Sequence, residues 1–150
     1  MRGGTLVYAV EADTASPWTP QAMVCAAACY STVGRTIYEP LVLVGDDGNT
    51  YPYLLDSITP NDDFTVWTLV VRDNITFQDG TPLDGPAVAY NLTQTQNAAL
   101  VGLAVGPMDT VTDDGDMTVT VTMSTPWPAF AFYLNSQLGL MASPTWLQGV

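Results

Sequence analysis

Histidine and lysine are both absent from this chain of 150 residues, and only three arginines balance 15 acidic side chains. Without histidine, neither a Ser-His-Asp nor a Cys-His catalytic site can be assembled, and zinc sites built on imidazole are excluded. The net charge of −12 repels phosphate backbones, so we expect no binding to nucleic acids. General acid–base chemistry would fall to aspartate, glutamate or tyrosine.

Long apolar runs are missing as well. No stretch approaches the ~20 residues that a membrane-spanning helix needs. The chain begins Met1-Arg2-Gly3-Gly4, without the charged and apolar regions of a signal peptide, so we expect any targeting segment to lie outside this chain. Apolar residues still make up 47% of the composition, which is ample for the core of one ordinary domain.

Cysteine occurs only at Cys25 and Cys29. On a helix the two side chains would share one face, with Cα atoms ~6 Å apart, a separation that a disulfide can span. The alternative is a pair of small buried thiols on an alanine-rich helix, and the sequence leaves their state open. Two thiols are too few for a structural zinc site, so we expect no metal.

Hydrophobic spacing and capping signals predict three helices. The first covers residues 21–33. The second runs from Pro86 to about residue 96, because Asp84 can cap it and proline suits a first helical turn. A short third helix is expected over residues 129–134.

Strands are predicted where β-branched and aromatic residues lie between turn-forming residues. Residues 118–123 give the clearest pattern, since threonine alternates with apolar side chains. Residues 97–107 are weakly patterned and predict a loop. The fold class is therefore α/β or α+β, with a largely antiparallel sheet over residues 53–123. The predicted strands are residues 5–10, 41–44, 57–59, 65–71, 75–77, 110–112, 118–123 and 138–142.

Six segments follow one another in an order that resembles a known family. The most specific are residues 62–72, DDFTVWTLVVR, and residues 75–83, ITFQDGTPL. The family is that of the family 5 extracellular solute-binding proteins, which include the peptide- and nickel-binding proteins of ABC importers. Gln78 departs from the histidine or serine that the family often has there. The other segments are residues 3–7, 37–42, 87–92, and 118–123 with 126–130.

The resemblance implies the N-terminal part of a periplasmic-binding-protein type II lobe with a mostly antiparallel, β-rich subdomain. Residues 1–40 would begin lobe I, residues 41–150 would form its supporting subdomain, and lobe II would be absent from this chain. The implied function is substrate binding for an ABC importer, not catalysis. The ligand would be a small peptide or similar solute, and the partners the membrane subunits of the importer. The implied location is the periplasm or a cell-surface lipoprotein, and no cofactor is expected.

By position in that family, the loop after the first strand lies along the ligand cleft. The resemblance therefore makes Trp18, Met23, Val24 and Ala26 the candidate ligand-binding residues, and it offers no catalytic residue. Peptides bound in this way are held by backbone hydrogen bonds, with permissive pockets for side chains. The alternative is that Trp18 and Met23 belong to the core.

The motif residues themselves suit a scaffold. Trp67 and Phe77 are expected on adjacent strands as apolar anchors, and Arg72 is expected to pair with an aspartate such as Asp79. Gly80 is expected to supply the positive φ of an Asp-Gly turn. The acidic turns at residues 46–49 and 113–116 lack the spacing of a calcium-binding loop, and we interpret them as solvated hairpin tips.

Two other functions fit parts of the sequence. A free-standing β-rich carbohydrate-binding or adhesion module could use exposed tryptophan and tyrosine side chains. A carboxylate hydrolase would need two acids across a cleft, and nothing in the sequence places such a pair.

Overall fold

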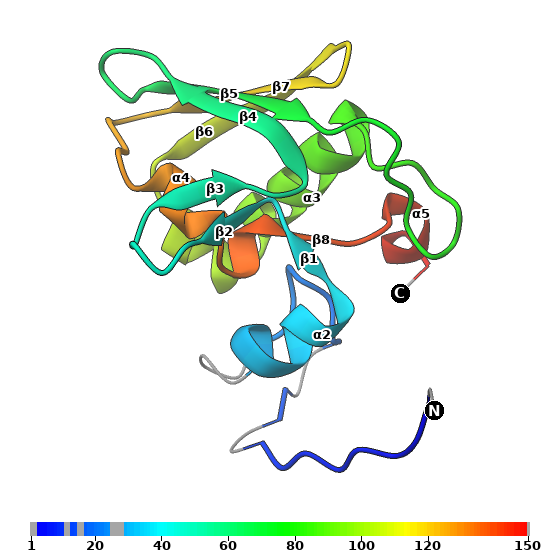
Figure 1. Ribbon diagram of the computed structural model, residues 1–150. Helices are drawn as coiled ribbons and strands as arrows, with labels where there is room; N and C mark the ends of the chain where they lie inside the picture. Colours follow the sequence, from blue (N-terminus) through cyan, green and yellow to red (C-terminus); the bar gives the residue numbers. More distant parts are fainter. Residues whose placement is uncertain (1–2, 11–12, 15–16, 25–28, 150) are drawn as a thin grey trace.

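The computed structural model describes residues 3–10, 13–14, 17–24 and 29–149, without the side chains of Cys29 and Tyr30. A four-stranded antiparallel sheet in the order β4-β5-β7-β6 forms its upper layer (Figure 1). The strands are β4 (Leu55–Pro60), β5 (Val66–Val71), β6 (Met108–Gly115) and β7 (Thr118–Met123).

Alternation along the two central strands creates one apolar and one polar face. Trp67, on β5, lies opposite Val121 on β7, and both side chains are buried. The other face carries a row of threonines, one from each strand, because the register aligns them across the sheet. This row is Thr59, Thr68, Thr120 and Thr112.

The hairpin between β6 and β7 turns later than the sequence indicates. Strand β6 continues through Asp113 to Gly115, and the turn residues are Asp116 and Met117, with φ of 47° and 63°. Two successive positive φ values are typical of the tight turns whose twist matches that of a hairpin. The acidic residues 113–116 therefore lie partly in β6. The predicted strands 57–59, 65–71 and 118–123 are confirmed.

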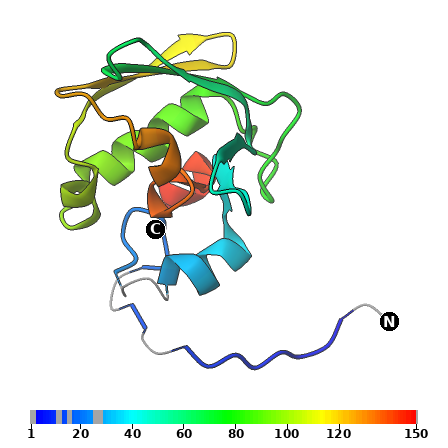
Figure 2. The same ribbon diagram turned by 60° about the vertical axis from the view of Figure 1, so that its left-hand side comes forward.

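Helix α3 (Gly85–Asn97) covers the apolar face of the sheet, as Figure 2 shows. The Asp84 side chain caps it by accepting a hydrogen bond from Ala87 N at 2.9 Å, and Pro86 stands in the first turn. Val88 and Leu92 are fully buried against the sheet. The predicted helix and its start signal are confirmed.

A lower layer brings together segments that are distant in sequence. Strand β1 (Glu39–Pro40) pairs with β8 (Leu140–Met141), and β2 (Val42–Val44) pairs with β3 (Thr50–Pro52). Around them lie the helical elements α2 (Arg35–Ile37), α4 (Phe130–Tyr133), η3 (Gln137–Gly139) and α5 (Pro144–Leu147). A second, smaller core cluster joins Met23, Tyr38, Leu140, Ala142 and Leu147.

The predicted first strand is not formed. Residues 3–10 run as an extended chain away from the body (Figure 2), with Leu6 88% and Val7 89% exposed. No strand in the described part of the chain lies beside them, and a strand without a hydrogen-bonding partner is not a strand. Residues 5–10 therefore have the composition of a strand, but the described part of the chain offers them no strand to pair with.

The helix predicted over residues 21–33 is displaced. Gln21 and Ala22 lie in a turn, and helical backbone runs from the π-helical turn η1 (Cys29–Gly34) into α2. Residues 25–28, and with them Cys25 and Ala26, lie outside the described residues.

Two other boundaries also differ. The expected loop at residues 97–107 contains the 3₁₀ helix η2 (Val101–Val105), and the expected strand at 138–142 is reduced to Leu140–Met141. None of the helices in the described ranges is both long enough and apolar enough to cross a bilayer.

Trp67 and Phe77 are not on adjacent strands. Trp67 lies in the central strand β5, whereas the segment of Phe77 forms only an isolated bridge, Thr76 to Pro82. Phe77 N donates to Thr81 O, and Gly80 N donates to Phe77 O, so the chain closes a tight turn instead of extending. Both aromatic side chains nevertheless contact the main core cluster. Gly80 has the expected positive φ, 85°.

The expected pair of Arg72 with Asp79 is wrong. Arg72 Nε lies 3.6 Å from Asp56 Oδ1, and both side chains are about half exposed, so the pair contributes little to stability. Asp79 instead accepts hydrogen bonds from Ser143 and Thr81.

Asn91 connects the two layers. Its side chain, 3% exposed, donates to Ala142 O at 2.8 Å and accepts from Ala142 N at 3.0 Å. The amide thereby satisfies both backbone groups of Ala142, which are buried with it, as a neighbouring strand would.

We expect Asn91→Ala to lower the free energy of unfolding by about 2–4 kcal/mol, since both polar groups of Ala142 lose their partner in a buried site. Thr93→Ala, on the same helix but half-buried, is the control and should change stability by less than about 0.5 kcal/mol. Urea unfolding of both variants measures the difference. Equal effects would show that the Asn91 amide carries no special share of the stability.

Burial of Tyr38 makes the free energy of unfolding depend on pH in the alkaline range. Burial raises the pKa of this phenol from 10.0 to about 12. The unfolded chain therefore ionises first, and the stabilisation from the neutral phenol is complete below pH 10 and lost as pH rises toward 12. Between these values Tyr38→Phe should lose less stability with pH than the parent chain, as thermal melts at stepped pH will show. Parallel pH profiles for the two chains would contradict this.

Candidate functional site

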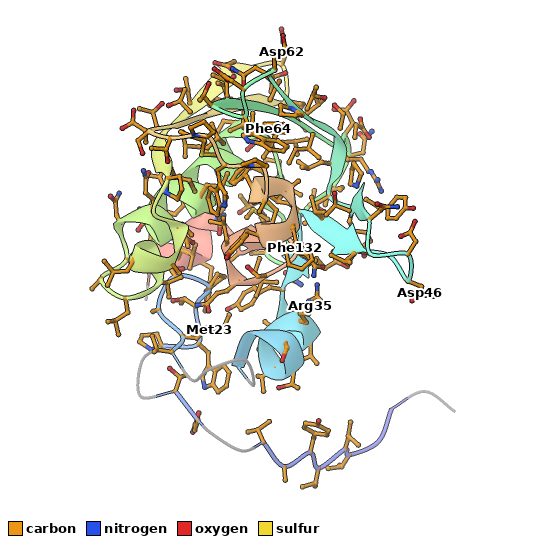
Figure 3. All side chains as sticks on the ribbon, turned by 90° about the vertical axis from the view of Figure 1, so that its left-hand side faces the viewer. Met23, Arg35, Asp46, Asp62, Phe64 and Phe132 are labelled. Carbon is orange, nitrogen blue, oxygen red and sulfur yellow. The ribbon has the colours of Figure 1, made fainter. Side chains whose placement is uncertain are left out.

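The predicted ligand-binding residues separate into core and surface. Trp18 is half-buried and packs on the smaller core cluster, and Met23, labelled in Figure 3, is 1% exposed within it. Val24 is 44% exposed. Ala26 lies outside the described residues. Of the three described, Val24 has the most exposed side chain.

Val24 lines a hollow of about 340 Å³. One wall consists of Gln21, Ala22 and Val24, and the other is the last turn of α3 with the residues that follow it. Leu100, 62% exposed, forms part of that second wall. The residues of the second wall are Gln94, Asn97, Ala98, Ala99 and Leu100. We call this hollow the amide hollow.

The first wall is held by hydrogen bonds from outside it. Gln137 Nε2 donates to Pro20 O at 2.7 Å and to Met23 O at 2.8 Å, so one side chain fixes both ends of the turn. Ala22 N and Met23 N both donate to Thr19 O. Several backbone groups of this turn are therefore already paired, and Gln21 and Val24 present their side chains to the hollow.

The chemistry of the amide hollow is neutral. Its lining contains no charged side chain, and Gln21, Gln94 and Asn97 each offer an amide that can donate and accept. Peptide groups have the same pairing capacity. In the described residues no three cysteine, aspartate or glutamate side chains gather as metal ligands.

The second wall was not predicted from the sequence. Gln94 belongs to the end of a predicted helix, and Asn97 and Leu100 belong to a segment interpreted as a loop. The available signal was the run of amide and hydroxyl side chains at residues 93–97, which is unusual for the end of an amphipathic helix.

A further hollow of about 350 Å³ begins one residue beyond Leu100. Val101, Ala104 and Val105 of η2 form one side, and the α4 segment forms the other. Tyr133, 41% exposed, belongs to that second side, as does Gln137. Gln137, which fixes the first wall of the amide hollow, therefore also lines this second hollow.

Gln137→Leu should loosen the turn at residues 19–24, because two carbonyl groups lose their donor. We expect hydrogen exchange at Ala22 and Met23 to speed up about tenfold, with little change in the central strands. Gln148→Leu, at an exposed glutamine that follows α5 as its C-cap, is the control. Unchanged exchange at residues 22–23 would refute the positioning role of Gln137.

Comparisons with known proteins agree on one family. The model of the bacterial extracellular solute-binding proteins, family 5 Middle, matches residues 49–146. The nickel-binding periplasmic protein of Escherichia coli K12 is 42% identical over 55 residues, 37% of this chain and 10% of the relative. The glutathione-binding protein GsiB of Shigella flexneri is 30% identical over 120 residues, 77% of this chain and 23% of the relative.

Solved structures show the same fold. NikA from Brucella suis in complex with Fe(III)-EDTA superposes with a TM-score of 0.72 at 21% identity, covering 89% of this chain and 27% of that one. OppA from Haemophilus influenzae complexed with RPPGFSPFR gives 0.73 at 18% identity, covering 91% and 30%. The mixed fold class with its antiparallel sheet is confirmed. The chain spans less than a third of any of these four proteins.

Proposed function

The chain belongs to family 5 of the bacterial extracellular solute-binding proteins, and from that premise we propose that it forms part of the substrate-binding component of an ABC importer that captures oligopeptides. The family is one of binding proteins rather than enzymes, as the resemblance implies. The observation that carries the oligopeptide proposal is the amide hollow, because a segment assigned to the cleft by position lines it through Val24.

The amide hollow supports a peptide in particular. Gln21, Gln94 and Asn97 can pair with backbone N–H and C=O groups, while Val24 and Leu100 give apolar contact without a charge requirement. The sequence predicts that backbone groups of this protein hold the peptide. Several backbone groups of the 19–24 turn already have partners, so side-chain amides take over that role in this proposal.

The wider architecture is part of the same proposal. Residues 1–40 begin one lobe, residues 41–150 form its supporting subdomain, and a second lobe from outside this chain closes on the solute. The membrane subunits of an importer are the partners. The site of action is outside the cytoplasmic membrane, in the periplasm or at the cell surface as a lipoprotein.

Val24→Asp and Leu100→Asp should each weaken peptide binding about tenfold or more, because each places a carboxylate in a neutral wall that a bound peptide would cover. Calorimetry with tri- and tetra-alanine, on the protein that contains this chain, measures the change. Leu43→Asp, on β2 and 38% exposed, is the matched control and should leave affinity unchanged.

Equal losses in all three variants would indicate a general effect of charge, and unaltered affinity in the first two would place the peptide elsewhere. Either result would contradict the assignment of the amide hollow.

A further inference from the structure

A separate pocket of about 250 Å³ opens where three distant segments meet. Ile37 and Tyr38 come from the end of α2, and Met141 to Ser143 come from β8 and the residues before α5. The turn that contains Phe77 forms a third side, and Trp146 of α5 completes the lining. This pocket shares no residue with the amide hollow.

Three aromatic side chains form its walls. The rings of Tyr38 and Trp146 have centroids 6.3 Å apart and planes tilted by 41°. Tyr38 is fixed, because its hydroxyl donates to Trp18 O at 2.6 Å. Phe77 is half-buried, and Trp146 is 43% exposed. One wall of the pocket is therefore held in place by Tyr38, while the indole of Trp146 is open to solvent.

A fixed carboxylate belongs to the same lining. Asp79 Oδ2 accepts from Ser143 Oγ at 2.5 Å, and Asp79 Oδ1 accepts from Thr81 N at 2.9 Å. The Ser143 hydroxyl and the Thr81 N–H hold the pKa of the Asp79 carboxyl below its usual value, so it is ionised at neutral pH. These partners are uncharged, and in the described residues the one ion pair joins Arg72 to Asp56.

The negative charge is therefore oriented but not neutralised. A smaller hollow adjoins the pocket, sharing Ile37, Phe77, Gln78 and Met141, and has Glu39 in its lining. The chain has no lysine, and Arg35, the arginine nearest in sequence to Ile37, donates to Asn135 O instead. A carboxylate and the face of an aromatic ring both attract positive charge, so a pocket that contains both favours a cationic ligand.

We propose that this pocket binds a small organic cation: an ammonium group on a compact apolar body. The apolar body lies against Phe77, Met141 and Trp146, and the ammonium group lies between the indole face and the Asp79 carboxylate. The volume falls below the range of about 300–1,000 Å³ usual for drug-sized ligands, so a single-ring or short-chain amine fits the site. The site is independent of the peptide site proposed above.

The test compares two probes of nearly the same shape, 2-phenylethylamine and 2-phenylethanol, by calorimetry at neutral pH and low salt. The amine should bind at least about tenfold more tightly than the alcohol, and its affinity should fall as salt screens the carboxylate. This comparison needs no variant. Equal affinity for the two probes, or no binding of the amine, would overturn the proposal.

Variants then locate the site. Asp79→Asn should reduce amine affinity about tenfold and leave the alcohol unaffected, and Trp146→Leu should reduce it severalfold. Asp62→Asn is the charge-matched control, because Asp62 is exposed on the hairpin between β4 and β5, at the top of Figure 3. A loss in Asp62→Asn equal to that in Asp79→Asn would reduce the effect to net charge and overturn the proposal.

Val24→Asp separates this inference from the proposed function. It should leave amine binding intact even where it weakens peptide binding, since the two pockets have no lining residue in common. Loss of amine binding in this variant would place the amine in the amide hollow and refute the separate site.

Discussion

The hydrogen bonds between the Asn91 amide and Ala142 are the contacts on which the arrangement of the molecule depends. Strand β8 has only two residues, too few to be held by pairing with β1 alone. Asn91 anchors its end to the helix that covers the sheet, so the large core and the small cluster become one body. The placement of Ser143 and Trp146 follows from that anchor, and with it the shape of the pocket lined by Tyr38, Phe77 and Trp146.

A second side-chain amide, that of Gln137, also joins segments that are distant in sequence. Gln137 follows α4 and holds the 19–24 turn through two carbonyl groups. Each pocket therefore has a wall that is positioned by one side-chain amide, Asn91 in one case and Gln137 in the other. Each amide binds backbone groups far away in sequence. Amides suit this task because one group can donate and accept without the desolvation penalty of a charge.

The sequence correctly predicted the features that depend on residues close together in the chain. The cap at Asp84, the bend at Gly80 and the alternation along β7 were all readable, since each depends on neighbouring residues. The features that were predicted wrongly or missed depend on partners distant in the chain. The segment of Phe77 turns back on itself instead of pairing, residues 5–10 find no strand beside them, and the second wall of the amide hollow exists only through packing.

The two outer strands of the sheet show how a chain without lysine protects its edges. Proteins commonly place lysine on such strands to stop copies from pairing edge to edge. Here β4 exposes Asp56, and β6 exposes Asp109, Asp113 and Asp114. Copies that approach edge to edge therefore bring carboxylates against carboxylates, which repel one another. Because added salt shortens the range of this repulsion, the barrier to edge-to-edge pairing weakens as ionic strength rises, whichever edge approaches.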